Sequence, residues 1–231
     1  MKTEVLDRPL QTKKEVLQSI SVDRKRTNLL NVQEQSALAW LVQRIPLWVT
    51  SDMLTAVGLF GSLVVGASFI LAFYLSKYFL ILGFPGFIIS WFGDSLDGRL
   101  AYYRQRPRKL YGFTLDITVD WMSIIAIGCG FIVYVRGMWD MLGYGFVVLY
   151  GWEMLIALMR YRITGKYSID SGKFGPTEAR ILISAFMILE VILPGSIIYS
   201  AGAAVVVLFV INVVDTHRLL QLADKMDKKG C

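Results

Sequence analysis

Long uninterrupted apolar runs constrain the fold of this chain more than any other feature. Residues 53–75 read MLTAVGLFGSLVVGASFILAFYL, and residues 203–214 read AAVVVLFVINVV. A helix rises about 1.5 Å per residue, so a run of about 20 apolar residues matches the roughly 30 Å hydrocarbon core of a bilayer. Charged residues make up 18% of the 231 residues, below the roughly 25% that is typical of soluble domains. The sequence therefore predicts an all-α integral membrane protein.

The apolar runs and the positive charges together predict a topology. Six transmembrane helices are expected, at about residues 53–75, 78–102, 113–136, 140–162, 178–198 and 200–217. Nearly all Lys and Arg residues between them fall on one side of the membrane, and only Lys77 and Arg136 fall on the other. Cytoplasmic segments carry the excess of Lys and Arg, so we expect both termini in the cytoplasm, most simply at a bacterial inner membrane. The formal net charge of +6 then reflects topology, and no nucleic-acid partner is expected.

The residues before the first span divide into two parts. Residues 1–30 are charged and lack clear periodicity, so we expect a mobile cytoplasmic segment. Residues 31–50 carry apolar residues at helical spacing, which predicts a short amphipathic helix that lies at the membrane interface and ends near Pro46. A plain juxtamembrane linker is the alternative for this second part.

One membrane domain is the simplest organisation of the rest. It would comprise residues 31–220, with a cytoplasmic tail at 221–231. Small residues occur inside two spans, where they permit close helix packing. They are Gly58, Gly61 and Gly66 in the first span and Gly128 and Gly130 in the third.

Four aspartates stand at the edges of two apolar spans. They are Asp94, Asp97, Asp116 and Asp120. The first two share one face near the end of the second span, and the last two share one face near the start of the third, because both spacings match helical turns. A loop of about ten residues joins the two spans, so antiparallel packing would direct all four carboxylates to one cavity near the cytoplasmic boundary.

Such a group of acids needs compensation. An Asp at the centre of a membrane helix costs about 2.5 to 3.5 kcal/mol on insertion scales, and neighbouring carboxylates repel each other. Divalent cations remove both penalties, and ligands that are all oxygen favour hard ions such as Mg²⁺, Mn²⁺ or Ca²⁺. Two ions would suit four acids, since such sites clamp a phosphate group during displacement.

Two alternative roles for the aspartates stay open. Buried ion pairs with Arg99 or Arg104 would serve structure alone, and a row of intramembrane carboxylates would suit a divalent metal transporter. The glycines beside the acids argue against both roles. Gly98 and Gly112 offer bare backbone to a flat or phosphorylated ligand, which neither role requires.

The same stretch resembles the signature of the CDP-alcohol phosphotransferase (class-I CDP-alcohol phosphatidyltransferase) family. That signature is D-x-x-D-G-x-x-A-R, eight or nine residues, then G-x-x-x-D-x-x-x-D. It is matched here, at the family's spacing, by Asp94, Asp97, Gly98, Ala101, Gly112, Asp116 and Asp120. The departure is Tyr102, which stands where the family usually has Arg and lacks a guanidinium's charge and fork of donors. With the six-span layout, the resemblance extends over residues 31–220.

The resemblance implies an enzyme that moves a phosphoalcohol from a CDP-alcohol to an acceptor hydroxyl and releases CMP. It implies that Asp94, Asp97 and Asp116 hold two ions, Mg²⁺ or Mn²⁺, and that Asp120 contributes to the second ion and acts as general base. The CDP moiety would bind against Asp94, Asp97, Gly98, Ala101 and Gly112. The family also suggests a homodimer. Tyr102 is expected to alter nucleotide affinity or substrate class, with Arg99 and Arg104 as nearby replacements.

A second polar cluster, after the fourth span, bears on the acceptor. Its candidate acceptor-binding residues are Arg160, Lys166 and Arg180, joined by Arg218 at the end of the sixth span. Converging Arg and Lys side chains favour a phosphorylated acceptor, although each residue alone also suits a topology signal that meets lipid headgroups. Relatives with such a pocket join inositol phosphate or glycerol phosphate to CDP-diacylglycerol, which is therefore our leading expectation. The alternative within the family is CDP-ethanolamine or CDP-choline with a lipid acceptor.

Overall fold

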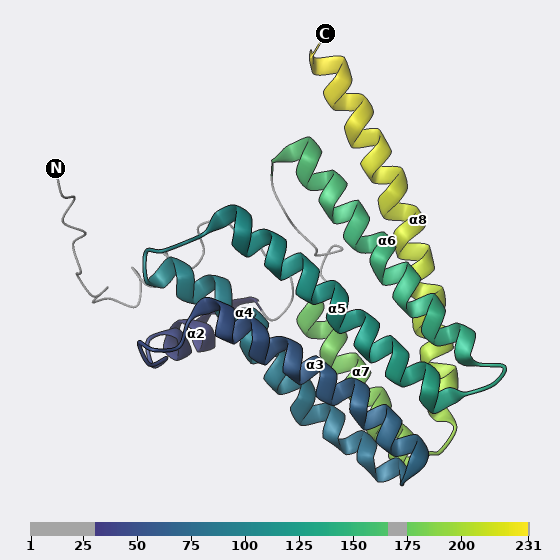
Figure 1. Cartoon of the computed structure of the whole chain (residues 1–231). Helices are drawn as coiled ribbons and strands as arrows, with labels where there is room; N and C mark the ends of the chain where they lie inside the picture. Colours follow the sequence, from purple (N-terminus) through teal and green to yellow (C-terminus); the bar gives the residue numbers. More distant parts are fainter. Residues whose placement is uncertain (1–30, 166–174, 231) are drawn as a thin grey trace.

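The computed structural model describes residues 31–165 and 175–230, so the predicted segment 1–30 and Lys166 lie outside the described residues. The described residues form helices and no strand (Figure 1). In chain order they are α2 (Asn31–Val42), α3 (Ser51–Tyr74), the 3₁₀ helix η1 (Lys77–Leu82), α4 (Gly83–Tyr103), α5 (Lys109–Val135), α6 (Asp140–Thr164), α7 (Pro176–Ile192) and α8 (Ser196–Gly230). The all-α prediction is therefore confirmed for the described part of the chain.

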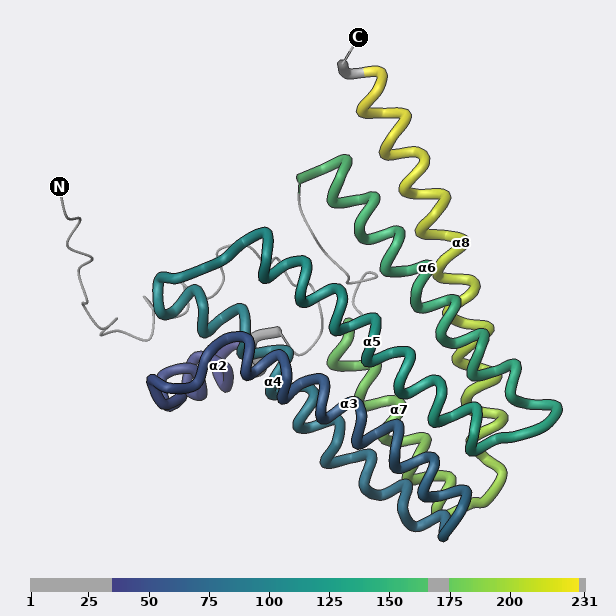
Figure 2. The backbone as a smooth tube through the Cα atoms, in the orientation of Figure 1, coloured from purple at the N-terminus to yellow at the C-terminus, as the bar shows by residue number. Residues whose placement is uncertain are grey.

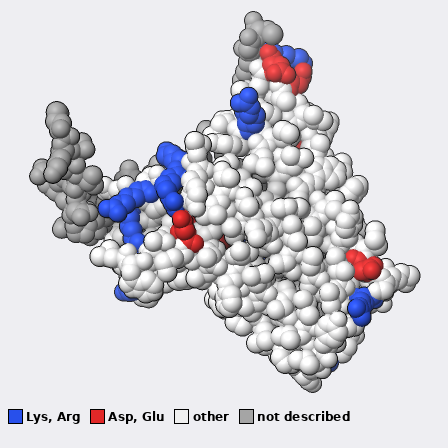
Figure 3. Space-filling view, viewed as in Figure 1, with Lys and Arg blue, Asp and Glu red and all other residues white. Residues whose placement is uncertain are grey.

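Five of the described helical segments are long and apolar enough to cross a membrane. They are Ser51–Tyr74, Lys77–Tyr103, Lys109–Val135, Asp140–Thr164 and Ser196–Lys228. The predicted fifth span corresponds to α7, which has only 17 residues. Prolines explain its length, because Pro176 occupies the start of α7 and Pro194 follows shortly after its end. The face shown in Figure 3 is mostly white, with Lys, Arg, Asp and Glu gathered at its ends.

The short helix expected within residues 31–50, with an end near Pro46, is present as α2 and ends at Val42. Leu38 and Val42 are fully buried against Leu96 and Leu100 of α4, whereas Trp40 is 54% exposed. The guanidinium of Arg104 donates hydrogen bonds to carbonyl groups of the connection that follows α2. These acceptors are the carbonyl oxygens of Ile45, Pro46 and Val49. The end of α4 therefore fixes the connection between α2 and α3.

Close contacts between backbones hold α3 against α4 and α5. A Cβ atom added to Gly93 would lie 2.3 Å from the backbone nitrogen of Gly58, and one added to Gly130 would lie 2.3 Å from the carbonyl oxygen of Gly66. Real Cβ atoms do not approach so closely, so these helices can lie together only because the residues are glycines. The close packing predicted for Gly58, Gly66 and Gly130 is confirmed, and Gly93 of α4 takes part in it as well.

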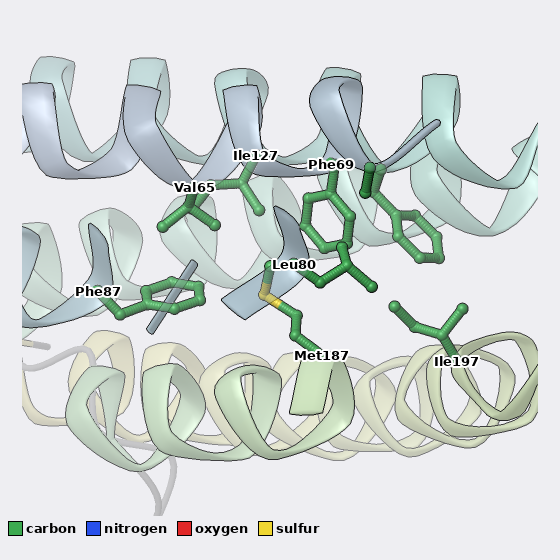
Figure 4. Packing of buried hydrophobic residues seen from close by; sticks show 9 residues of the cluster. Val65, Phe69, Leu80, Phe87, Ile127, Met187 and Ile197 are labelled. Carbon is green, nitrogen blue, oxygen red and sulfur yellow. The ribbon is translucent and has the colours of Figure 1, made fainter. Parts of the chain in front are cut away.

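An apolar core fills one end of the bundle. Side chains from α3, η1, α4, α5, α7 and α8 meet there (Figure 4): Val65, Phe69, Leu80, Phe87, Ile127, Met187 and Ile197. Phe69 also meets Phe131 edge to face, with ring centroids 5.6 Å apart. The core occupies the end of α3 and the start of α4, so the aspartates, which lie toward the other end of α4, belong to the opposite end of the bundle.

A buried carboxylate connects α7 to α8 beside this core. Glu190 is 4% exposed and accepts hydrogen bonds from the hydroxyl of Tyr134 at 3.0 Å, from the backbone nitrogen of Gly195 at 2.9 Å and from that of Ile197 at 2.8 Å. Ser196 adds a fourth donor at 3.3 Å. These bonds satisfy amide groups at the start of α8 that no residue of the helix can satisfy. From this turn α8 runs alongside α6 (Figure 2).

Candidate active site

The four aspartates converge on one small cavity, as the sequence predicts. Asp94 and Asp97 reach it from α4, and Asp116 and Asp120 reach it from α5. Thr55 and Gly58 of α3 and Arg180 of α7 line the same cavity. α4 and α5 run antiparallel and are joined by a short connection, and both pack against α3, which brings these side chains together.

Three of the carboxylates are arranged to share one cation. Oxygen atoms of Asp94, Asp116 and Asp120 all lie within 4.8 Å of one another, and the three residues are partly buried. A donor set of carboxylate oxygens in a half-buried position suits a hard divalent ion such as Mg²⁺ or Mn²⁺. The residues present therefore fit the metal that the sequence implies.

The fourth carboxylate, Asp97, is held by polar groups around it. It is 5% exposed, and its Oδ2 accepts a 2.7 Å hydrogen bond from the hydroxyl of Thr55. Its Oδ1 accepts a hydrogen bond from the backbone nitrogen of Gly98, and its backbone carbonyl accepts one from the hydroxyl of Ser51 at 2.8 Å. The sequence analysis did not identify Ser51 and Thr55. Two hydroxyls one helical turn apart at the start of an apolar span do indicate a polar site on that face of the helix.

Arg180 lies among the aspartates. Its Nη2 is 2.7 Å from Oδ2 of Asp94, and both side chains are partly buried, with 18% and 20% exposure. The sequence singled out Arg180 as a candidate for the acceptor and did not anticipate a direct ion pair with a candidate metal ligand. The two residues are 86 positions apart in the chain, so only the packing of α7 brings them together.

The two arginines considered as replacements for the family arginine hold backbone groups in place. Arg104 donates to the connection between α2 and α3. Arg99 is 5% exposed and donates to the carbonyl of Ser95, one turn earlier on α4. Tyr102 lies in the last turn of α4 and is partly buried. These hydrogen bonds of Arg99 and Arg104 thus fix α4 and its neighbours.

The small residues of the signature lie on both helices that carry the aspartates. Gly98 and Ala101 follow Asp97 along α4 and are partly buried. A Cβ atom on Gly112 would meet no atom within 4 Å, so open space adjoins the backbone at the start of α5. At the same end of the bundle, the side chain of Arg108 donates to Asp52, and this hydrogen bond raises the pKa of the Arg108 guanidinium.

The remaining two candidate acceptor residues of the described chain meet at a carboxylate that sequence reasoning missed. Oδ2 of Asp215 lies 3.6 Å from Nη2 of Arg160, and its Oδ1 lies 3.4 Å from Nη1 of Arg218. Asp215 is only 5% exposed, between α6 and α8. An acid at the end of an apolar run is a functional signal in a membrane protein, so the sequence does contain a signal for Asp215. Arg180 is separate from this pair, because it contacts Asp94.

Comparison with known proteins identifies a family. No curated protein matches the chain. The family profile described as CDP-alcohol phosphatidyltransferase matches residues 48–216, well over half of the chain, including all four aspartates. Members of this family transfer a phosphatidyl group from a CDP-alcohol to an alcohol acceptor in a membrane, and they generally depend on divalent metals. This chain belongs to the CDP-alcohol phosphatidyltransferase family.

Proposed function

We propose that this protein transfers the phosphatidyl group of CDP-diacylglycerol to a hydroxyl of inositol phosphate or glycerol phosphate and releases CMP. The observation that carries the proposal is the convergence of Asp94, Asp97, Asp116 and Asp120 on one partly buried cavity in a chain of this family. Phosphoryl transfer chiefly requires charge neutralisation and alignment of the reacting groups, and a cluster of carboxylates that binds cations supplies the means for both.

The metal ligands in this proposal are the four aspartates. Asp94, Asp116 and Asp120 would hold one ion, since their oxygens lie within 4.8 Å of one another. Asp97 would add a ligand for a second ion, with its orientation set by Thr55. When bound, Mg²⁺ or Mn²⁺ neutralises the charge of the two phosphates of the CDP-alcohol. Thr55 and Gly98 keep the Asp97 carboxylate in place for this role.

Asp120 is the proposed general base. The acceptor hydroxyl attacks the phosphorus that carries the lipid, a new P–O bond forms, and the P–O bond to CMP breaks. The hydroxyl proton passes to the carboxylate of Asp120, and CMP leaves with the electron pair of the broken bond. A base in this position contributes roughly 10²- to 10⁴-fold to the rate. Asp120 lines the same cavity as the other aspartates, which supports this role.

The remaining binding residues follow from the same arrangement. Together with Asp94 and Asp97, Gly98, Ala101 and Gly112 would accept the CDP moiety, and the open space beside Gly112 supports this assignment. Tyr102 would alter nucleotide affinity or substrate preference, because a phenol replaces a charged group there. For the acceptor phosphate we propose Arg160, Arg180 and Arg218, with Lys166 from outside the described residues.

The membrane setting completes the proposal. α7 would be the fifth of six spans in chain order, in addition to the five long apolar segments. α2 would lie at the interface, and both termini would be cytoplasmic, in agreement with the distribution of Lys and Arg. We further propose a homodimer in a bacterial inner membrane. The four aspartates would then lie near the cytoplasmic boundary, where a water-soluble acceptor meets a lipid donor.

A donor-by-acceptor assay tests the proposal directly. Purified protein would receive labelled CDP-diacylglycerol with inositol phosphate or glycerol phosphate, or labelled CDP-ethanolamine or CDP-choline with diacylglycerol or a ceramide. The proposal expects CMP release and a labelled anionic lipid in the first arm, and neither in the Asp120→Asn variant. Turnover confined to the second arm would transfer the assignment to the other substrate class. Metal uptake without CMP release in any arm would indicate a transporter.

A further inference from the structure

The candidate metal cavity contains its own cation. Among the described residues that line it, four are aspartates and one, Arg180, carries positive charge. The guanidinium contacts Oδ2 of Asp94 at 2.7 Å, and Asp94 is one of the three residues whose oxygens are close enough to share an ion. The guanidinium therefore contacts a carboxylate that would also serve a divalent ion.

The backbone of Arg180 is well fixed, so exchange at this site would be a movement of its side chain. The carbonyl of Arg180 accepts a 2.8 Å hydrogen bond from the hydroxyl of Ser184, one turn later on α7. Earlier in the helix, the side chain of Glu178 accepts from the backbone nitrogen of Gly175, which caps the start of α7. A long arginine side chain has several rotamers, so its head can leave Asp94 while α7 stays in place.

We propose that Arg180 is a built-in counter-ion that occupies the metal site in the ion-free protein and is displaced from Asp94 when a divalent ion binds. Its first role is to relieve repulsion among carboxylates in a partly buried cavity, where neighbouring like charges are costly. Its second role follows from displacement. A released guanidinium beside bound metal is able to pair with phosphate, so metal binding would prepare the site for an anionic substrate.

This inference deepens the proposed function, on which it rests for the identity of the metal site. The affinity for metal distinguishes displacement of Arg180 from an ion pair that persists when the metal binds. Were Arg180 to stay on Asp94 after the ion binds, both cations would share the carboxylate and no side-chain movement would follow. If Arg180 is displaced instead, breaking its contact with Asp94 reduces the net free energy of metal binding. Loss of the guanidinium then raises metal affinity and lowers the stability of the ion-free form.

The first test measures Mn²⁺ affinity by electron paramagnetic resonance titration of the purified protein and of its Arg180→Gln variant. Arg136→Gln is the matched control, because it removes the same charge from an exposed position beside Phe73, outside the residues that line the cavity. We expect Arg180→Gln to bind Mn²⁺ about tenfold more tightly than the control and to unfold at a lower temperature in EDTA. Equal or weaker Mn²⁺ binding by Arg180→Gln would overturn the proposal.

The second test uses the wild-type protein and so does not depend on a variant that folds. Phenylglyoxal modifies accessible arginines, and peptide mass spectrometry reports the labelling rate of each one. We expect Mn²⁺ to raise the labelling rate of Arg180 several-fold over the rate in EDTA and to leave that of Arg136 unchanged. An equal or lower rate in Mn²⁺ would contradict displacement. Either negative result leaves the transferase proposal standing as long as Mn²⁺ binds, whereas failure to release CMP counts against the transferase alone.

Discussion

The hydroxyl of Thr55 donates a 2.7 Å hydrogen bond to Oδ2 of Asp97, across the contact between α3 and α4. Both side chains are buried, and the other oxygen of the same carboxylate accepts a hydrogen bond from the backbone nitrogen of Gly98. The first span therefore contributes to the candidate site even though it carries none of the four aspartates. Its contribution is to fix the orientation of one of them.

Replacing Thr55 with Val should weaken the site without unfolding the protein, because Val has nearly the same shape and lacks the hydroxyl. A buried hydrogen bond to a charged group contributes roughly 1.5 to 3 kcal/mol, so we expect kcat/KM to fall about tenfold or more. Thr55→Ser should restore most of the rate. The control is Thr118→Val, since Thr118 is exposed and donates to the carbonyl of Thr114 on its own helix. Equal rates for Thr55→Val and Thr118→Val would exclude the orienting role.

Neutralising an acid of the cavity should abolish turnover while the fold persists. Asp116→Asn removes a metal ligand, and Asp120→Asn removes both a ligand and the proposed base, so we expect each to retain well under a tenth of wild-type CMP release. Size-exclusion chromatography in detergent should show unchanged folded yield. Activity above a tenth of wild type in either purified variant would remove that residue from the proposed mechanism.

Chelation should stop the reaction reversibly. Because the donor set consists of carboxylate oxygens, EDTA is expected to remove CMP release, and added Mg²⁺ or Mn²⁺ to restore it, with Zn²⁺ a poor substitute. The measurement is CMP release against free metal concentration. Turnover that continues in excess EDTA after dialysis would rule out the metal assignment.

Arg160 should act on the acceptor and not on the donor. It lies 3.6 Å from Asp215, which holds its head between α6 and α8. We expect Arg160→Gln to raise KM for the phosphorylated acceptor about tenfold and to leave KM for CDP-diacylglycerol within about twofold. Arg162→Gln is the control, because Arg162 lies two positions further along α6 and so points to a different side of the helix. Identical kinetics for the two variants would place the acceptor elsewhere.

Glu190 is expected to matter for stability alone. Glu190→Ala removes the acceptor for four hydrogen bonds and leaves buried donors at the start of α8, so the free energy of unfolding should fall by about 3 kcal/mol or more. Tyr134→Phe removes one of the four donors and should cost about 1 kcal/mol. Unfolding by denaturant in detergent measures both. A change in Glu190→Ala no larger than in Tyr134→Phe would contradict this role of the carboxylate.

The sequence predicts the long helices well because apolarity and helix signals coincide there. The span expected at 53–75 is α3, Ser51–Tyr74, which starts where the hydroxyl of Thr50 accepts from the backbone nitrogen of Met53. The span expected at 78–102 begins instead as η1, and α4 starts at Gly83, because Pro85 is suited to a first helical turn.

Helix ends differ from the expected span ends where hydropathy and helix formation separate. Hydropathy predicts that the last span ends at 217, but α8 continues to Gly230 through polar residues that form helical pairs, such as Lys228 with Asp224 at 2.6 Å. The helix therefore continues without interruption through residue 220, where the boundary between the membrane domain and the tail is expected. The span expected at 178–198 is too long at its end, because α7 ends at Ile192 before Pro194 and α8 starts at Ser196.

The candidate site divides in the same way. The four aspartates are predictable because their spacing lies within single helices, and helical geometry fixes which residues share a face. The contacts of Thr55 and Arg180 with these aspartates are not predictable, since they depend on the packing of α3 and α7. The placement of Arg160 and Arg218 around Asp215 likewise depends on how α6 lies against α8.

The contact between Gly58 and Gly93 has a consequence for substrate access. A Cβ on Gly93 would strike the backbone of Gly58, so main chain rests on main chain one position before Asp94. No side chain lies between the two helices at this contact, so no change of rotamer could open a space for a ligand there. A lipid-linked nucleotide therefore has no path between α3 and α4 at this level, whereas open space adjoins the backbone of Gly112 at the start of α5.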